Sequence, residues 1–335
     1  MATIEPVHAL FDTPQFRGAN LPALWIYSSS TGDKSYTGVW CLTDLVDMDD
    51  GKIIIHEKVL SEKVDTLIQL ALDTDISSSP VLLTYYPDKE IDEIVAAICS
   101  GNRPLIIEQD NVEFKLWEVA DPVGIEKLQN AFSRLSKVFV ADGHHRLAAA
   151  QSMPGSKGLL SSLYISSDQI NISAFHRLIC LDGSFYHGDL LTRLKMCFSV
   201  HKLECNTPYR PDQRHVIGLY VQKCWYRLEL KLTNQSSTLP DVTLLQNIIL
   251  APMLGISDPG KDERIRNFPD YQWKKMVALL AEDDTYICFT LFPMSVAEFL
   301  DVAESRNVLP PKSTWIDPKI PEQLLVHLIQ PIRLA

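Results

Sequence analysis

The sequence lacks the short patterns that mark several common classes of protein. Its seven cysteines are scattered and odd in number, and no two of them form a CxxC pair. In a chain of 335 residues this argues against both a zinc cage and a disulfide framework. Neither GxxxxGKS/T nor GxGxxG occurs, so neither a P-loop nor a dinucleotide-binding fold is predicted. We expect reduced cysteines.

Long apolar runs and basic clusters are also missing. No apolar stretch approaches the length of a membrane span, and the N-terminal segment lacks the charged and apolar regions of a signal peptide. Lys and Arg number 31 against 42 Asp and Glu, a net charge of −11, whereas a nucleic-acid surface needs clustered Lys and Arg. We expect a soluble, cytoplasmic protein without a nucleic-acid or membrane partner. A homodimer is compatible with the sequence.

What is present is a mixture of strand and helix patterns. Short β-branched runs, such as residues 80–86, indicate buried strands, and apolar residues spaced i, i+3, i+4 and i+7 from Val64 indicate a helix. The patterns mix without a repeat, which predicts an α+β (mixed α/β) fold. The stretch 152–158 has linker composition. We expect a first domain over 1–152, a second α+β domain over 153–306, and a C-terminal segment over 307–335 that returns to the active-site cleft.

The most informative stretch joins a strand to a helix. Residues 137–141 are apolar and β-branched, whereas the segment after Arg146 is Ala-rich and typical of a helix. Between them lies the turn Asp142–Arg146. Backbone N–H groups at a helix start lack internal partners and favour an anion. Gly143 lets the backbone approach a ligand, and Arg146 can hold phosphate oxygens with two nitrogens. This pattern predicts a phosphate site.

Two other interpretations of this turn remain open. In the first, Asp142 caps the helix and the histidines are surface residues. In the second, Asp142, His144 and His145 form a metal site of two histidines and one carboxylate. Adjacent side chains diverge by about 100° on a helix, which disfavours a shared ion.

A second candidate is the His56-Glu57 pair at the end of a predicted strand. A carboxylate beside a phosphate site can accept a proton from an attacking hydroxyl. The alternative is that Glu57 is a surface residue flanked by the solvated side chains of Lys58 and Lys63.

Two further segments are rich in groups that bind anions. The motif Pro310–Lys319 contains prolines, two lysines and two hydroxyls, and such donors suit a phosphate or carboxylate. The alternative is an ordered proline-rich surface segment. The charged run 258–266 contains Asp262 and Arg264, and it is either a solvated loop or a site loop.

Five short segments occur along the chain in the following order: HEK at 56–58, ADGHHR at 141–146, ILAPMLGI at 249–256, DERI at 262–265 and PPKSTWIDPK at 310–319. Together they resemble a widespread, mostly bacterial family that is catalogued as a domain of unknown function with a DGHHR signature. The resemblance extends from about Leu24 to His327. Leu147 stands where the family usually has an aromatic residue, and the Pro-Pro-Tyr-Asp element near the N-terminus is absent.

The turn itself resembles the phosphate-binding box of the ParB/sulfiredoxin superfamily, which includes ParB nucleotidases, sulfiredoxin and free-serine kinases. This resemblance implies a ParB/sulfiredoxin-like nucleotide-binding core over residues 1–152. In free-serine kinases a glutamate from an early strand-to-helix junction acts as the base toward the serine hydroxyl, and Glu57 is at such a junction. His144 or His145 stands where sulfiredoxin has its reactive cysteine, so sulfinic-acid chemistry is not expected.

Residues and resemblance together predict a nucleotide-dependent kinase of a small hydroxyl metabolite. Free L-serine is the leading acceptor, ATP or ADP the donor, and Mg²⁺ the metal. A metal-dependent phosphohydrolase and a non-catalytic nucleotide-sensing protein are the alternatives. Glu57, Asp142 and His144 are the predicted catalytic residues, with Asp142 also the Mg²⁺ ligand. The predicted phosphate-binding residues are Gly143, His144, His145, Arg146, Lys312, Ser313, Thr314 and Lys319, and the predicted substrate-binding residues are His56, Asp262 and Arg264.

Overall fold

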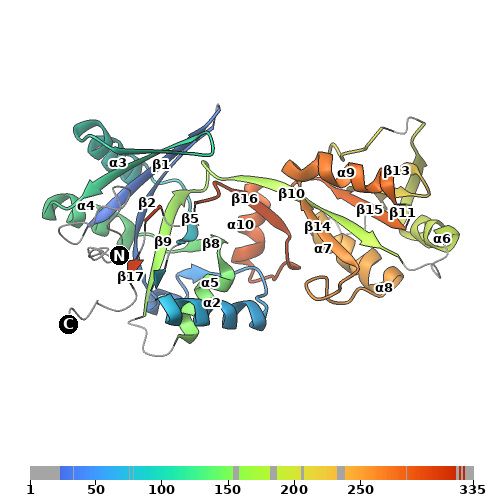
Figure 1. Cartoon of the computed structure of the whole chain (residues 1–335), viewed down its shortest axis with the longest axis horizontal. Coiled ribbons are helices and arrows are strands. Elements are labelled where there is room, and N and C mark those ends of the chain that lie inside the picture. Colours follow the sequence, from blue (N-terminus) through green and yellow to red (C-terminus); the bar gives the residue numbers. More distant parts are fainter. Residues whose placement is uncertain are drawn as a thin grey trace. The chain divides into compact units, whose positions relative to one another are not determined.

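The chain forms two compact units in the computed structural model (Figure 1). Unit 1 comprises Met1–Asn171 and Pro318–Ala335, and unit 2 comprises Ile172–Asp317. Unit 1 is therefore discontinuous in sequence, because its two segments lie before and after unit 2. The structure describes residues 23–32, 34–74, 76–77, 79–153, 158–181, 187–204, 207–231, 238–283, 285–321, 324–325 and 327–328.

Unit 1 is built on a sheet that has eight strands within the described residues, in the order β3-β8-β5-β9-β2-β1-β7-β6. Strand β3 runs parallel to β8, and β5 runs parallel to β9, whereas the other neighbours are antiparallel. The strands are β1 (Leu24–Thr31), β2 (Lys34–Asp44), β3 (Ile53–Ile54), β5 (Val81–Tyr85), β6 (Leu105–Gln109), β7 (Val112–Val119), β8 (Val138–Asp142) and β9 (Leu159–Ser166). A separate pair joins β4 (Ile76–Ser77) to β17 (His327–Leu328).

Helices α3 (Lys89–Gly101) and α4 (Pro122–Ser133) bury their apolar sides against the sheet. Ile91 and Leu128 are fully buried in the same core as strand residues of β1 and β2. Each helix begins at an aspartate, Asp88 or Asp121, whose carboxylate accepts hydrogen bonds from backbone N–H groups of the first turn. Local capping and the 3.6-residue apolar period therefore account for both helices.

Helix α2 (Ser61–Thr74) packs against α5 (His144–Ser152), and Figure 1 shows the two helices side by side. The short helix α1 (Val46–Asp49) precedes β3. This pairing brings together two chain segments that are far apart in sequence. Helix α2 follows β3 and helix α5 follows β8, and these two strands are neighbours in the sheet.

Unit 2 is built on a second sheet, with the order β11-β13-β12-β15-β10-β14 and with β16 paired to β10. Its strands are β10 (Asn171–Cys180), β11 (Phe198–Lys202), β12 (Val216–Val221), β13 (Cys224–Leu230), β14 (Ile265–Pro269), β15 (Tyr286–Leu291) and β16 (Thr314–Asp317). Its helices are α6 (His187–Cys197), α7 (Asp241–Leu244), the π-helix η1 (Leu245–Leu250), α8 (Ala251–Leu254), the 3₁₀-helix η2 (Asp270–Gln272), α9 (Trp273–Glu282) and α10 (Val296–Glu304).

The two faces of this second sheet carry separate cores. Successive strand residues point to opposite faces, so Phe289 of β15 packs with Leu194 of α6 and Leu245 of η1, whereas Cys288 packs with Met276 of α9. Helices therefore cover both faces of the sheet. The predicted mixed α+β fold class is confirmed by the two sheets and their helices.

The compact units divide the chain differently from the domains expected over 1–152, 153–306 and 307–335. Strand β9 belongs to unit 1, because it pairs with β2 and β5, which both precede the linker-like stretch. Most of that stretch, residues 154–157, lies outside the described residues. Residues 307–317 belong to unit 2, since β16 pairs with β10, and only the segment from Pro318 returns to unit 1.

Candidate functional site

The predicted phosphate turn lies at one end of the strands of the unit 1 sheet, where β8 stops. Strand β8 ends at Asp142, and its parallel neighbour β3 ends at Ile54. The register pairs Ile54 with Phe139, so Glu57 and Asp142 each follow a paired residue by three positions. Because the carboxyl ends of neighbouring parallel strands lie at the same end of a sheet, the chain leaves β3 toward Glu57 and β8 toward Gly143 at that end.

The strand is irregular immediately before the turn. Leu82 of β5 pairs with Asp142, but Leu83 pairs with Val140, so Ala141 is an extra residue in β8. Such a β-bulge increases the local twist and redirects the following side chain. The bulge therefore sets the direction in which the chain leaves the sheet at Asp142.

Gly143 makes the turn possible. It precedes helix α5 with φ +96° and ψ +26°, in the left-handed region that favours glycine. A Cβ built on Gly143 would lie 2.9 Å from both Nε and Nη2 of Arg146, which shows that the guanidinium lies directly over the glycine. The first helical hydrogen bond runs from Leu147 N–H to the Gly143 carbonyl at 3.0 Å. The start of an α-helix favours an anion through its N–H groups and dipole.

Asp142 lies between two cations. Arg146 donates from Nη2 to Oδ2 at 2.8 Å, and Lys319 donates from Nζ to Oδ1 at 2.6 Å. Burial of Asp142 raises its pKa, but the charges of Lys319 and Arg146 together outweigh burial, so the pKa lies below its ordinary value. The carboxylate is therefore ionised at neutral pH, and the three side chains together carry one net positive charge.

These contacts do not support the predicted role of Asp142 as a Mg²⁺ ligand, because each carboxylate oxygen already contacts a cationic nitrogen. Nor do the described residues contain a group of three or more His, Cys, Asp or Glu side chains that could hold a metal ion. The role of Asp142 as a ligand of Mg²⁺ held together with nucleotide phosphates stays a prediction. The groups that could bind an anion at this turn are the backbone amides, Arg146 and Lys319.

The two histidines of the turn contact the segment that carries Glu57. The rings of His144 and His56 meet edge to face with centroids 4.5 Å apart, and both side chains are buried, with 7% and 1% exposure. His145 accepts a hydrogen bond at Nε2 from the backbone N–H of Leu60 at 3.1 Å. Residues 56–60 are thus attached to the turn at both ends.

Burial also fixes the charge of this histidine pair. It lowers the pKa of His144 to about 4, although the nearby charge of Asp142 opposes that shift. Burial lowers the pKa of His56 as well, and the proximity of His144 adds to the effect. Both rings are therefore neutral at pH 7. His56 is buried beneath the turn, which does not favour its predicted contact with a substrate.

Three of the predicted phosphate-binding residues belong to unit 2. The buried Arg177 donates from Nη2 to the carbonyl of Lys312 at 2.9 Å, and Lys312 has φ +59°. Ser313 donates from Oγ to the Pro310 carbonyl at 2.5 Å, and Thr314 begins β16. These contacts give the proline-containing motif an ordered backbone within unit 2, and phosphate binding by its side chains stays a prediction.

The predicted substrate residues Asp262 and Arg264 pair with each other. Arg264 donates from Nη2 to Asp262 Oδ2 at 2.6 Å and from Nε to Oδ1 at 2.9 Å. It also donates to the carbonyl of Leu254, at the end of α8. This pair therefore stabilises a loop and a helix end in unit 2.

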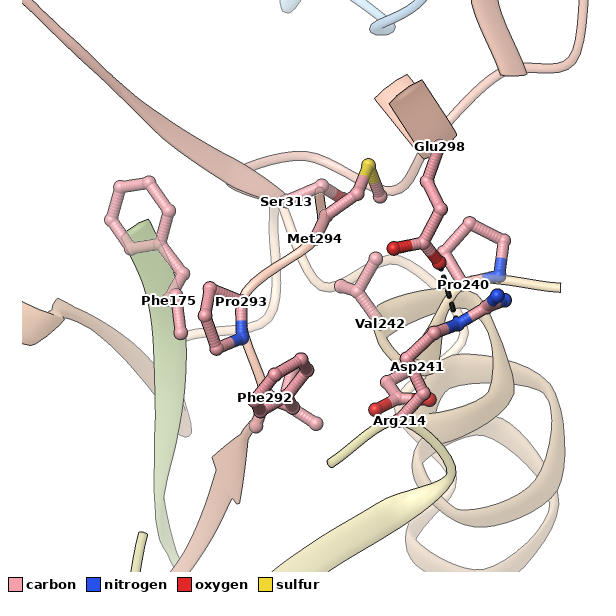
Figure 2. A pocket seen from close by; sticks show the side chains of 12 residues that line it. Phe175, Arg214, Pro240, Asp241, Val242, Phe292, Pro293, Met294, Glu298 and Ser313 are labelled. Atoms are coloured by element: carbon pink, nitrogen blue, oxygen red, sulfur yellow. Dashed lines mark ion pairs between the residues drawn. The ribbon is translucent and has the colours of Figure 1, made fainter. Parts of the chain in front are cut away.

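A pocket in unit 2 contains polar residues that sequence reasoning missed. Arg214 donates from Nε to Glu298 at 2.7 Å, and Figure 2 shows these two side chains meeting beside Asp241. The buried Asp241 accepts from the His215 backbone N–H at 2.9 Å, and burial raises its pKa to about 6. Asp241 and His215 are far apart in sequence, so no local pattern indicates their contact.

The two sheets, with their helices, define a mixed α+β protein of two units, in which a glycine turn opens a helix beside two cations. The chain belongs to the family described as "Protein of unknown function (DUF1015)", whose model matches residues 12–248. No curated protein matches the chain in sequence. None of the helices in the described residues has both the length and the apolar character needed to cross a membrane.

Several solved structures show partial similarity to this chain. A conserved hypothetical protein from Pyrococcus furiosus has 14% identity and a TM-score of 0.47, covering 84% of this chain and 93% of the other. A free serine kinase in complex with AMP has 14% identity and a TM-score of 0.44, covering 83% and 87%. SbnI with a C-terminal truncation, from Staphylococcus aureus, has 12% identity and a TM-score of 0.48, covering 86% and 87%. Each of these scores is below 0.5, and they assign no activity and no ligand to this chain.

Proposed function

We propose that this chain is a nucleotide-dependent kinase that transfers a phosphoryl group from ATP or ADP to the hydroxyl of a small metabolite, with free L-serine as the leading acceptor. One juxtaposition carries the proposal. The glycine turn that opens α5 lies beside Arg146 and Lys319, and the segment with Glu57 adjoins that turn. The resemblance of the turn to the ParB/sulfiredoxin phosphate-binding box supports a nucleotide as the donor.

The anion-binding part of this proposal consists of the helix start and two side-chain cations. Because Gly143 has no Cβ, the guanidinium of Arg146 can lie over it, next to the backbone N–H groups of the helix start that bind a polyphosphate in this proposal. The guanidinium of Arg146 lies over Gly143, and Lys319 lies on the other oxygen of Asp142. In this proposal Asp142 positions the two cations, and a phosphate oxygen then shares them.

The chemical part of the proposal assigns the proton to Glu57. The acceptor hydroxyl gives its proton to the Glu57 carboxylate while its oxygen forms a bond to the terminal phosphorus of the nucleotide. The bond from that phosphorus to the bridging oxygen breaks, and the shortened nucleotide leaves with the electron pair. Such a reaction depends on positioning and charge neutralisation more than on covalent catalysis. A carboxylate needs hydrogen-bonding distance to the hydroxyl to serve as this base.

The test is phosphoryl transfer by the purified full-length protein. ATP and ADP are each offered with a panel of hydroxyl amino acids and sugars, and products are identified by ³¹P NMR and mass spectrometry. We expect a phosphorylated acceptor, with O-phosphoserine the leading product. Release of inorganic phosphate without any phosphorylated acceptor would overturn the kinase proposal.

A pair of variants tests the base. Glu57→Gln keeps the shape of the side chain but cannot take the proton, so we expect turnover to fall at least 10²-fold while nucleotide affinity is retained. Glu62→Gln, at an exposed position in the first turn of α2, is the matched control and should turn over normally. Equal activity of the two variants would exclude Glu57 as the base.

A further inference from the structure

The histidines of the turn contact protein groups. We propose that His144 and His145 are positioning residues that hold the segment 56–60, which contains Glu57, against the turn. In this proposal the backbone amides, Arg146 and Lys319 bind the phosphates. This inference rests on the proposed function for its catalytic consequence. It adds to the prediction made from sequence, in which the Gly143–His145 amides and Arg146 hold the phosphates and His144 is counted among the catalytic residues.

The His145 contact determines what that side chain can do. Its Nε2 accepts the Leu60 N–H at 3.1 Å, so Nε2 carries no proton and the hydrogen of the ring is on Nδ1. A ring in this tautomer is neutral and cannot donate from Nε2 to a phosphate oxygen. Leu60 is also the residue whose carbonyl accepts from Lys63 and Val64 at the start of α2. One ring nitrogen therefore joins the start of α5 to the start of α2.

The second attachment is a ring contact. His144 lies edge to face on His56 with an interplanar angle of 85°. Its Nε2 is buried and has no hydrogen-bond partner within the described part of the chain. Edge-to-face packing of this kind favours a fixed ring orientation. Because both rings are buried and neutral, they contribute packing and no positive charge to the site.

These two attachments restrict the position of the Glu57 backbone relative to the turn. Only three residues lie between His56 and Leu60, and Glu57 is the first of them, so its Cα lies about 3.8 Å from that of His56. The start of the segment is fixed by the His144 ring and its end by the His145 hydrogen bond. The backbone of Glu57 is therefore held in place relative to the turn that would hold the phosphates. Misplacement of a reacting group by about 1 Å can cost 10²-fold in rate.

Two variants of His145 separate positioning from phosphate binding. His145→Gln can keep an acceptor near the position of Nε2, whereas His145→Leu removes it. We expect His145→Leu to lower kcat about 10²-fold while the Kd for ATP or ADP, measured by calorimetry, changes less than threefold. His145→Gln should recover most of the lost kcat. A tenfold or greater rise in Kd for His145→Leu would instead show that the side chain contacts the nucleotide and would overturn the proposal.

A double variant tests whether His145 acts through Glu57. In the Glu57→Gln background, His145→Leu should cause little further loss of kcat, because the group that it positions is already inactive. An additional 10²-fold loss in that background would show a role independent of Glu57 and would contradict the inference. Circular dichroism and a thermal melt of each variant verify that it is folded.

Hydrogen exchange tests the attachment without any turnover. The Leu60 N–H should exchange slowly in the wild type and in His145→Gln, and much faster in His145→Leu. If the wild type and His145→Leu exchange at the same rate, the attachment does not exist and the inference is wrong. If protection is lost as expected while no acceptor is phosphorylated, the attachment stands and the kinase proposal alone fails.

Discussion

Lys319 Nζ lies 2.6 Å from Oδ1 of Asp142, although 177 residues separate them in the sequence. The same carboxylate accepts from Arg146 through its other oxygen. Asp142 therefore gathers two cations beside the start of α5. Removing either cation changes the charge of the turn without changing its backbone, which makes Lys319 a direct probe of anion binding.

Lys319→Ala should weaken nucleotide binding about tenfold, equivalent to about 1.4 kcal/mol, because one of two cations is lost. The deficit should shrink as salt is added, since screening weakens such charge interactions. Lys115→Ala, on strand β7 where Lys115 pairs with Glu113, is the control and should bind nucleotide normally. Calorimetry with ATP and ADP measures both variants. Unchanged affinity of Lys319→Ala at low salt would show that the phosphates do not bind at this turn.

Gly143→Ala should destabilise the protein and weaken nucleotide binding together. At φ +96° a side chain is strained by about 1–3 kcal/mol. Its Cβ would also displace the guanidinium of Arg146. Gly101→Ala is the matched control, because a Cβ at that helical position meets no atom within 4 Å. Urea unfolding should show a loss for Gly143→Ala and none for Gly101→Ala. Equal midpoints would contradict the backbone conformation assigned to Gly143.

The buried His144 predicts a stability that falls as the pH is lowered. Its pKa is about 4 in the folded chain and about 6.5 when unfolded. Between these values the unfolded chain binds a proton that the folded chain does not, so stability is full above about pH 6.5 and is lost toward pH 4. The slope is at most about 1.4 kcal/mol per pH unit for this histidine. His144→Phe keeps a ring and should flatten that dependence in urea unfolding. An unchanged slope would show that His144 titrates normally.

For Asp241 in unit 2 we expect the opposite change, a stability that rises as the pH is lowered. Burial raises its pKa to about 6, above the value of 3.8 for an ordinary aspartate. The folded chain therefore binds the extra proton in this interval, and the wild type should gain stability relative to Asp241→Asn as the pH falls from 7.5 to 5. Asp283→Asn is the control, because hydrogen bonds from Thr285 lower the pKa of Asp283. The Asp283 carboxyl is therefore ionised in both the folded and the unfolded chain over this pH range. Urea midpoints at the two pH values measure the change. A constant difference between wild type and Asp241→Asn would contradict the shift.

The local pattern of the sequence predicts most of the individual elements. The apolar period around Ile91 yields α3, and the β-branched run before Asp142 yields β8, because Ile91 and Val140 both belong to the core of unit 1. The sequence also predicts a helix over Asp241–Leu250, but the helical stretch continues to Leu254 through the π-helical turn η1 and contains Pro252. A proline inside a helix cannot donate the backbone hydrogen bond of its turn, and Pro252 lies two residues after the π-helical turn.

Contacts between distant segments could not be predicted in this way. Strand β9 belongs to unit 1 through pairing with β2 and β5, and nothing in its own composition indicates that choice. The hydrogen bond between Leu60 and His145 joins residues 85 apart and uses a backbone donor, which carries no sequence signal. The motif at Asp142–Arg146 could be recognised because its glycine, arginine and acid act locally. Which protein groups its histidines contact depends on the packing of α2 against α5.

The discontinuity of unit 1 has a consequence for the order in which the protein is made. Synthesis proceeds from the N-terminus, so the turn at Asp142–Arg146 is completed long before the segment that begins at Pro318. Until that segment is synthesised, Asp142 can pair with Arg146 but not with Lys319. The nascent chain therefore acquires the full charge of its turn only after Lys319 has been synthesised, and all of unit 2 is synthesised before that.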